Sequence, residues 1–278
     1  MVRMASSEAI KNAKHKMKKS LGQNFLNNDE IVSDIQASVN PNQPIMEIGP
    51  GIGALTQKLL ELEQKVLCVE LDDSLIQPLI KTFGNNPQFS LWHHDCLDIS
   101  LEQLQQHFDN QQISVVANIP YYITTPIIKK IVEDWSSVVD EAILMVQEEV
   151  AKRICASPCS KAYGSLSVYV QTKCEAKYLF KVGKENFVPQ PKVDSAIIKI
   201  VKGNRYQLDW EDYSNFLQNC FSQKRKTLIN NLSTSYNIAK LKVEKWLDAF
   251  GLAKTIRAEE ISVEQFVILY NNLKELHE

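Results

Sequence analysis

The hydrophobic and polar positions along this chain of 278 residues follow two periods in turn. Short apolar runs rich in β-branched residues are typical of buried strands, and apolar residues at helical spacing separate them. The first helical stretch runs from Asn28 to Ser38, with Ile31, Val32 and Ile35 on its inner face. We expect strands near residues 45–49, 66–70, 89–92, 113–117 and 141–146. Because helices lie between the strands, the pattern predicts a doubly wound, mostly parallel α/β sheet.

The pattern changes toward the C-terminus. Two segments, Ser165–Lys173 and Asp194–Val201, are predicted to form an antiparallel edge hairpin. Beyond residue 203 only helical spacing remains, with Gly251 as a helix stop and Ser262 as an N-cap. The expected helices cover residues 213–220, 226–232, 240–250 and 263–276. We therefore predict a sheet domain over residues 17–204 and a small all-helical domain over residues 205–278.

A glycine-rich turn follows the first strand. Glycines at positions 49, 51 and 53, with Ala54, match the relaxed dinucleotide-binding pattern, and glycine lets the backbone approach a ligand closely. Glu47 at the strand end disfavours a pyrophosphate but suits S-adenosylmethionine, which carries a sulfonium and an ammonium group. Glu70 ends the next strand, 21 residues after Gly49, where an acidic side chain accepts hydrogen bonds from ribose hydroxyls. Asp95 closes the third strand and is a candidate acceptor for the adenine amine of the cofactor.

The run Asn118-Ile119-Pro120-Tyr121 ends the fourth strand. An adenine amine is a poor nucleophile and needs acceptors that hold its protons while it becomes tetrahedral. The Asn118 side-chain carbonyl and the Ile119 backbone carbonyl offer such acceptors, Pro120 fixes the local geometry, and Tyr121 offers a stacking face. Each of these residues also has an ordinary structural interpretation, such as a turn or a helix cap. Polar sites at four successive strand ends favour the functional interpretation.

Five segments together resemble the rRNA adenine dimethyltransferase family. They are Lys19–Leu26, Glu47–Gly51, Val69–Asp72, Asn118–Tyr121 and Phe187–Ser195. The resemblance runs from about residue 17 to the C-terminus, and the chain is most similar to the bacterial enzymes of the small ribosomal subunit. The residue after Tyr121 is often Asn in this family and is Tyr122 here.

This resemblance implies a Rossmann-like methyltransferase that uses S-adenosylmethionine and no metal. It implies dimethylation of two adjacent adenines near the 3′ end of 16S rRNA in the small ribosomal subunit, with a role in subunit biogenesis. The implied catalytic residue beyond the Asn118–Tyr121 run is Phe187, whose ring would stack on the target base. The implied cofactor contacts are Asn24, Leu26, Gly49, Glu70, Asp95 and Asn118.

The formal charge of −2 hides an uneven distribution. Residues 1–20 carry Arg3 and five lysines against Glu8 alone, and residues 1–16 are expected to be a flexible basic tail. Residues 177–205 carry seven basic side chains against two acidic ones, and Lys224–Lys226 form a third cluster. Such patches indicate partial contact with a polyanion, although solvated lysines explain any single cluster equally well.

The six cysteines form no C-x-x-C pair and are expected to be reduced, and a zinc site at Cys155 and Cys159 is disfavoured because histidines are not nearby. No apolar run is long enough to span a membrane. We expect a cytoplasmic monomer. Three alternatives remain open: a related enzyme of large-subunit rRNA, a ribosome-assembly factor that uses the fold for binding, and a nucleotide-dependent oxidoreductase.

Overall fold

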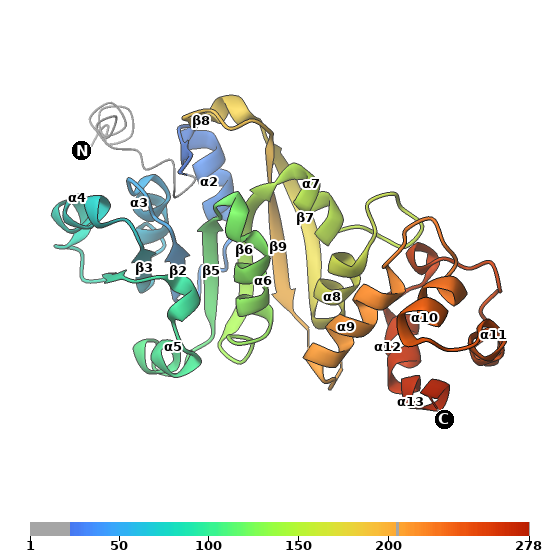
Figure 1. Cartoon of the computed structure of the whole chain (residues 1–278). Coiled ribbons are helices and arrows are strands. Elements are labelled where there is room, and N and C mark those ends of the chain that lie inside the picture. The colour runs from blue at the N-terminus through green and yellow to red at the C-terminus, as the bar shows by residue number, and fades with distance from the viewer. Residues whose placement is uncertain (1–22, 204–205, 278) are drawn as a thin grey trace. The chain divides into compact units, whose positions relative to one another are not determined.

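The computed structural model describes residues 23–203 and 206–277 (Figure 1). The expected flexible tail over residues 1–16 lies outside the described residues. By their contacts, the residues fall into two compact units. The first unit comprises the chain up to Ala151 together with Lys177–Lys202, and the second comprises Lys152–Ala176 and the chain from Gly203.

The first unit is built on a mostly parallel sheet with the strand order β4-β3-β2-β5-β6-β9-β7 (Figure 1). The strands β2 to β6 pair in parallel, whereas β9 pairs antiparallel with β6. Their bounds are β2 Ile45–Ile48, β3 Val66–Glu70, β4 Phe89–His93, β5 Ile113–Asn118, β6 Val139–Gln147, β7 Cys174–Val182 and β9 Ser195–Lys202. The predicted doubly wound, mostly parallel sheet with an antiparallel edge is confirmed.

Helices connect the parallel strands, as the apolar spacing predicts. Asn28 caps the helix that precedes the first of these strands, because its side chain accepts from the N–H groups of Glu30 and Ile31. The helices are α2 Asp29–Ser38, α3 Ala54–Leu60, α4 Asp73–Phe83, α5 Leu101–His107, α6 Thr124–Val132 and α7 Glu148–Ile154. Short 3₁₀ turns occur at η2 Cys96–Asp98, η3 Tyr121–Ile123 and η4 Lys184–Asn186. Both faces of β2, β3 and β5 are buried, which explains their continuous apolar runs.

The second unit is helical. Its helices are α8 Ser165–Lys173, α9 Trp210–Cys220, α10 Leu228–Tyr236, α11 Lys240–Ala249, α12 Val263–Asn271 and α13 Leu273–His277, with the 3₁₀ turn η5 Ala258–Glu260. Aromatic side chains dominate its core, with the rings of Tyr213, Phe216 and Tyr270 in mutual contact. Ser262 caps α12 in a capping box with Gln265, as its sequence context predicts.

The prediction of a strand over Ser165–Lys173 is wrong, because this segment forms the helix α8. Two of its polar side chains, Ser167 and Thr172, lie inside rather than on a solvated face. Ser167 is buried, and the Thr172 hydroxyl donates to the Val168 carbonyl at 2.7 Å and lies 3.0 Å from the Tyr213 hydroxyl. A helix buried on most sides shows no amphipathic period, and its β-branched residues then mimic a strand. The sheet edge is instead formed by β7.

The expected domain boundary near residue 204 also differs from the observed grouping. Residues 152–176, which include α8, group with the C-terminal helices rather than with the sheet. The chain therefore leaves the sheet unit within α7 and returns to it within β7. Because this excursion depends on long-range contacts between α8 and the helices α9 and α12, no local composition change marks it.

Candidate active site

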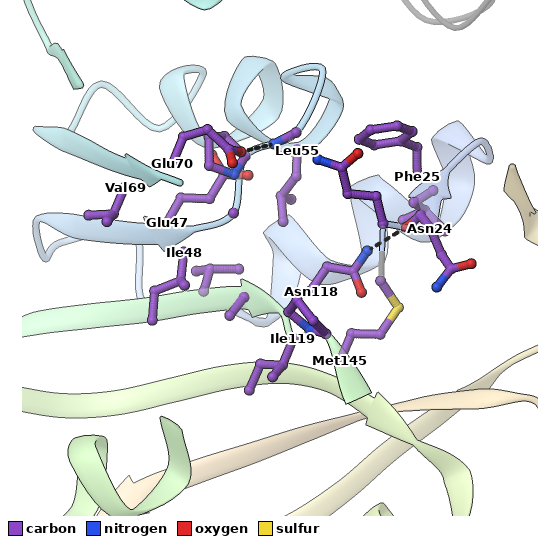
Figure 2. A pocket seen from close by; sticks show the side chains of 18 of the residues that line it. Asn24, Phe25, Glu47, Ile48, Leu55, Val69, Glu70, Asn118, Ile119 and Met145 are labelled. Carbon is purple, nitrogen blue, oxygen red and sulfur yellow. Dashed lines mark hydrogen bonds between the residues drawn. The ribbon is translucent and has the colours of Figure 1, made fainter. Parts of the chain in front are cut away.

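One pocket lies at the carboxyl ends of the central strands of the first unit (Figure 2). In a parallel sheet these ends form the crevice where ligands bind. The predicted site residues that line the pocket are Asn24, Leu26, Gly49, Glu70, Asp95, Asn118, Pro120 and Tyr121. The fold therefore brings together side chains from the N-terminal segment and from three strand ends.

The glycine turn after β2 is fixed by a hydrogen bond to the Glu70 carboxylate at the end of β3. Gly49 and Gly51 adopt φ angles of +69° and +59°, which other residues rarely adopt. The Gly51 N–H donates to Glu70 Oε2 at 3.2 Å (Figure 2). The Asp72 N–H donates to Glu70 Oε1 at 2.8 Å. Glu70 is buried, and this desolvation raises the pKa of its carboxyl group. Glu70 thus fixes the glycine turn in addition to facing the pocket.

Glu47 is the most deeply buried acid of the pocket, with 2 % of its surface exposed. Its Oε2 accepts from the Thr56 hydroxyl at 2.6 Å, and the Cys68 thiol lies 3.4 Å from the same oxygen. Burial raises the pKa of Glu47 to about 7, because these hydrogen bonds offset only part of the desolvation. The charge of this carboxyl group therefore depends on pH in the neutral range.

The charge of the pocket is negative. Glu47, Glu70 and Asp95 line it, and the lining residues that the structure describes include no lysine or arginine. Asp95 Oδ1 accepts from the Leu97 N–H at 2.9 Å and so caps η2. Acids without a cation repel a pyrophosphate and favour a ligand that carries positive charge. These carboxylate acceptors fit the hydroxyl, amine and ammonium groups of S-adenosylmethionine. No cluster of three metal-ligating side chains occurs among the described residues.

Asn118 ends β5, and its amide is oriented by the N-terminal segment. Its Nδ2 donates to the backbone carbonyl of Asn24 at 3.0 Å (Figure 2). Because the amide nitrogen is engaged in this way, Oδ1 is the atom left to accept from a ligand. A backbone carbonyl 94 positions away in sequence thus determines which end of the Asn118 amide is available.

The backbone carbonyls of the same run are not equivalent. The Pro120 carbonyl accepts from the Ile123 N–H at 3.1 Å, and the Tyr121 carbonyl accepts from the Thr124 hydroxyl at 3.2 Å. The Ile119 N–H donates to the Met145 carbonyl at 3.1 Å, which holds the run against β6. Among the backbone hydrogen bonds of the described chain outside the regular elements, none reaches the carbonyl of Ile119, a residue that is 1 % exposed and lines the pocket.

The segment Gln23–Asn28, here called the N-terminal strap, is tied to distant parts of the first unit. It contains β1, Phe25–Leu26, which pairs antiparallel with β8, Phe187–Val188. Gln23 Nε2 donates to Asp72 Oδ2 at 2.8 Å. Because the strap supplies Asn24 and Leu26 to the pocket, these contacts explain how residues so far from the strand ends in sequence reach the site.

Phe187 does not occupy the predicted place. Its side chain is 3 % exposed, does not line the pocket and belongs to the hydrophobic core with Leu26, Val182 and Met145. The pairing of β8 with β1 directs the ring into this core. Phe187 thus packs in the core with Leu26 of the N-terminal strap, and its stacking on a target base stays a prediction.

Two exposed apolar side chains in the pocket were not assigned a role from the sequence. Leu71 is 47 % exposed and follows Glu70, and Tyr122 is 60 % exposed and follows Tyr121. Large apolar side chains that stay exposed beside a pocket are typical of ligand contacts. The available signal for Leu71 was its position directly after the predicted polar strand end at Glu70, and for Tyr122 its position directly after the predicted run Asn118–Tyr121.

Tyr121 lies next to Tyr122 but is held differently. Its ring is half-buried, and its hydroxyl lies 2.8 Å from Ser195 Oγ on β9. Partial burial raises the pKa of the Tyr121 hydroxyl. The ring is thus fixed at one end while it lines the pocket.

The Rossmann-like sheet, with its acidic pocket at the strand ends, identifies the protein as an S-adenosylmethionine-dependent methyltransferase. The sequence profile described as ribosomal RNA adenine dimethylase matches residues 14–275. The chain belongs to this family.

Known proteins agree with this assignment. The chain is 42% identical over 265 residues to "Ribosomal RNA small subunit methyltransferase A" of Hydrogenovibrio crunogenus, covering 93% of this chain and 97% of that protein. A crystal structure of a dimethyladenosine transferase from Plasmodium falciparum is similar with a TM-score of 0.74 and 26% identity, covering 91% of this chain and 98% of the other. The 23S rRNA methyltransferase ErmE is similar with a TM-score of 0.69 and 25% identity, covering 90% and 100%.

Proposed function

We propose that this protein transfers methyl groups from S-adenosylmethionine to the exocyclic amines of two adjacent adenines near the 3′ end of 16S rRNA. The substrate is the small ribosomal subunit or its precursor. The observation that carries the proposal is the acidic pocket with Asn118 in its lining. The Asn118 amide nitrogen donates to the Asn24 carbonyl at 3.0 Å, so Asn118 Oδ1 can accept from a substrate. The relatives named for the small subunit support the choice of rRNA.

The pocket residues have complementary roles in this proposal. Bound S-adenosylmethionine supplies the activated methyl group on its sulfonium. Each Glu70 oxygen accepts one backbone N–H, from Gly51 or Asp72, and its remaining lone pairs accept from the ribose hydroxyls. Asp95 accepts from the adenine amine of the cofactor. Gly49, Leu26 and Asn24 line the rest of the cofactor space. The negative charge of the pocket favours the cationic cofactor.

The target adenine is extruded from the RNA and stacks on Tyr121. Its amine would donate to Asn118 Oδ1 and to the Ile119 carbonyl while the nitrogen attacks the methyl carbon. The carbon–sulfur bond would break at the same time, so that S-adenosylhomocysteine leaves, and the cationic amine would then release its proton to solvent. Pro120 directly follows these two acceptors and fixes the backbone there, with φ at −55°. The rate gain comes from orientation and from acceptors placed before the reaction. No strong base is needed, because the amine loses its proton only as it becomes cationic.

RNA affinity comes from basic side chains of the second unit in this proposal. Residues 223–226, here called the basic loop, are exposed between α9 and α10. Asn231 is buried and donates through Nδ2 to the Cys220 carbonyl at 2.7 Å and to the Gln223 carbonyl at 3.3 Å, which fixes the start of the loop. Its charges would contact phosphates and add affinity without reading sequence.

The protein acts in this proposal as a cytoplasmic monomer. The part of the chain that the structure describes has no helix that is both long and apolar enough to cross a membrane. The decisive assay incubates the purified protein and labelled S-adenosylmethionine with one of two substrates. The first is small subunits from cells that lack this protein, and the second is naked large-subunit rRNA. Dimethyladenosine in the small-subunit rRNA, detected by mass spectrometry, is the expected result. Labelling of the large-subunit rRNA alone would refute the proposed substrate.

A further inference from the structure

We propose that Tyr122 is a stacking surface for the adenine next to the one being methylated. This inference rests on the proposed function and deepens it, because it names a second nucleotide contact at the same pocket. Two adjacent adenines are modified in turn, so the neighbour lies at the pocket mouth while the first occupies the pocket. An unpaired purine held there needs an aromatic face.

The exposure of Tyr122 points to a surface at the mouth. Its side chain is 60 % exposed although it lines the pocket. Of the large apolar side chains that are exposed in the described chain, only Leu71 and Tyr122 line the pocket. An aromatic face left in water at a binding site is typical of a surface that a ligand covers.

The backbone beneath the ring is fixed. Tyr122 is the middle residue of η3, which begins after Pro120. The Ile123 N–H donates to the Pro120 carbonyl at 3.1 Å, and the Thr124 hydroxyl donates to the Tyr121 carbonyl at 3.2 Å. The turn therefore presents the ring without a loop that must be ordered on binding, which lowers the entropic cost of stacking.

The other aromatic candidates are held by other contacts. Phe25 also lines the pocket, but it packs against the cluster of Leu75, Leu79 and Phe83. The Tyr121 hydroxyl lies 2.8 Å from Ser195 Oγ, which holds that half-buried ring within the pocket. Phe187 is 3 % exposed in the core. Tyr121 thus suits the extruded target base, and Tyr122 suits the base beside it.

The test is a double-mutant cycle in which one change is made in the protein and the other in the RNA. The protein changes are Tyr122→Ala, Tyr122→Leu and Tyr122→Phe. The RNA change replaces the neighbouring adenine with uracil in small subunits from cells that lack this protein. On the natural particle, loss of one base–aromatic stack should raise KM and lower kcat/KM roughly tenfold or more for Ala. Leu keeps apolar volume without an aromatic face and should lose nearly as much, whereas Phe should restore most of the lost kcat/KM.

The particle with uracil separates stacking from a general loss of fit. Uracil stacks more weakly, so Tyr122→Ala should cost much less on this particle. Cofactor affinity and Tm should match wild type, and Tyr178→Ala, which removes an exposed ring that does not line the pocket, should leave KM unchanged. Equal losses on both particles, or no loss with Ala, would overturn the inference. Should wild type methylate neither particle, the proposed function itself is wrong and the inference falls with it.

Discussion

Replacing Asn118 with alanine tests the chemistry of the pocket directly. The change deletes Oδ1, the acceptor for the target amine, and Nδ2, which donates to the Asn24 carbonyl at 3.0 Å. The two losses affect different quantities. Loss of the bond to Asn24 affects the stability of the N-terminal strap, whereas loss of Oδ1 affects the transition state.

The magnitudes show which effect dominates. One hydrogen bond such as that to Asn24 contributes about 0.5–1.5 kcal/mol to stability, and Asn118 is only partly buried, so the variant should fold. Removal of one preorganised hydrogen-bond partner of a transition state lowers kcat by about 10²–10³, or about 2.7–4 kcal/mol. We expect the methyl-transfer rate to fall at least about a hundredfold while the protein remains folded.

The variant Asn118→Asp separates the acceptor from its orientation. Its carboxylate still accepts from the amine, but neither oxygen can donate to the Asn24 carbonyl. At the wild-type geometry two acceptor oxygens would face each other about 3 Å apart, so the carboxylate must turn or the strap must move. We therefore expect the rates to rank wild type, then Asp, then Ala.

The measurement is single-turnover methyl transfer to small subunits that lack the modification. Cofactor affinity by calorimetry and Tm by thermal unfolding serve as controls, since RNA binding through the basic loop should survive. An alanine variant that matches wild type would mean that Asn118 is only a turn residue and that the mechanism is wrong. An aspartate variant that matches wild type would refute the orienting role of Asn24.

Three further predictions follow from burial and charge. Because burial raises the pKa of Glu47 from 4.5 to about 7, the stability due to its protonated form is complete below pH 4.5 and is lost as pH rises through about 7. This loss of unfolding free energy amounts to about 3 kcal/mol between pH 4.5 and pH 7. Glu47→Gln should therefore flatten the dependence of the unfolding free energy on pH in this range. An unchanged pH dependence would contradict the raised pKa of Glu47. Phe187→Ala should lower the free energy of unfolding by about 3–5 kcal/mol, measured by urea denaturation, because the ring is buried in the core; a loss of activity without destabilisation would instead restore a stacking role. Charge reversal of the three basic side chains in the basic loop should weaken particle binding and reduce its salt dependence while cofactor affinity stays unchanged, as filter binding at several salt concentrations would show; an unaltered salt slope would place the RNA surface elsewhere.

The parallel sheet was predictable from the sequence because its signals are local. Each central strand is a short apolar run buried on both faces, and the predicted runs agree with β2 to β6 within about two residues. The segment over Ser165–Lys173 was not predictable in the same way. Its polar residues bond internally, as Thr172 does to the Val168 carbonyl, so the periodicity that reports a surface helix is absent.

Some residues of the candidate site could likewise be predicted from local sequence, and others could not. Asn118 and the acids at the strand ends could be placed together, because the carboxyl ends of neighbouring parallel strands meet at one edge of a sheet. The direction of a side chain at a loop depends on what packs against it. Phe187 faces the core because β8 pairs with β1, and Tyr122 stays exposed because nothing in the described chain covers its ring.

The sequence by itself determined the class of fold, the glycine turn and the polar groups at each strand end, since these depend on residues close together in the chain. Only the tertiary structure decided the raised pKa of Glu47, which depends on burial beside Cys68 and Thr56. It also decided that the Asn118 amide is oriented by a carbonyl 94 positions away, and that residues 152–176 join the helical unit. Desolvation, hydrogen-bond orientation and helix packing are set by groups distant in sequence, and no local pattern encodes them.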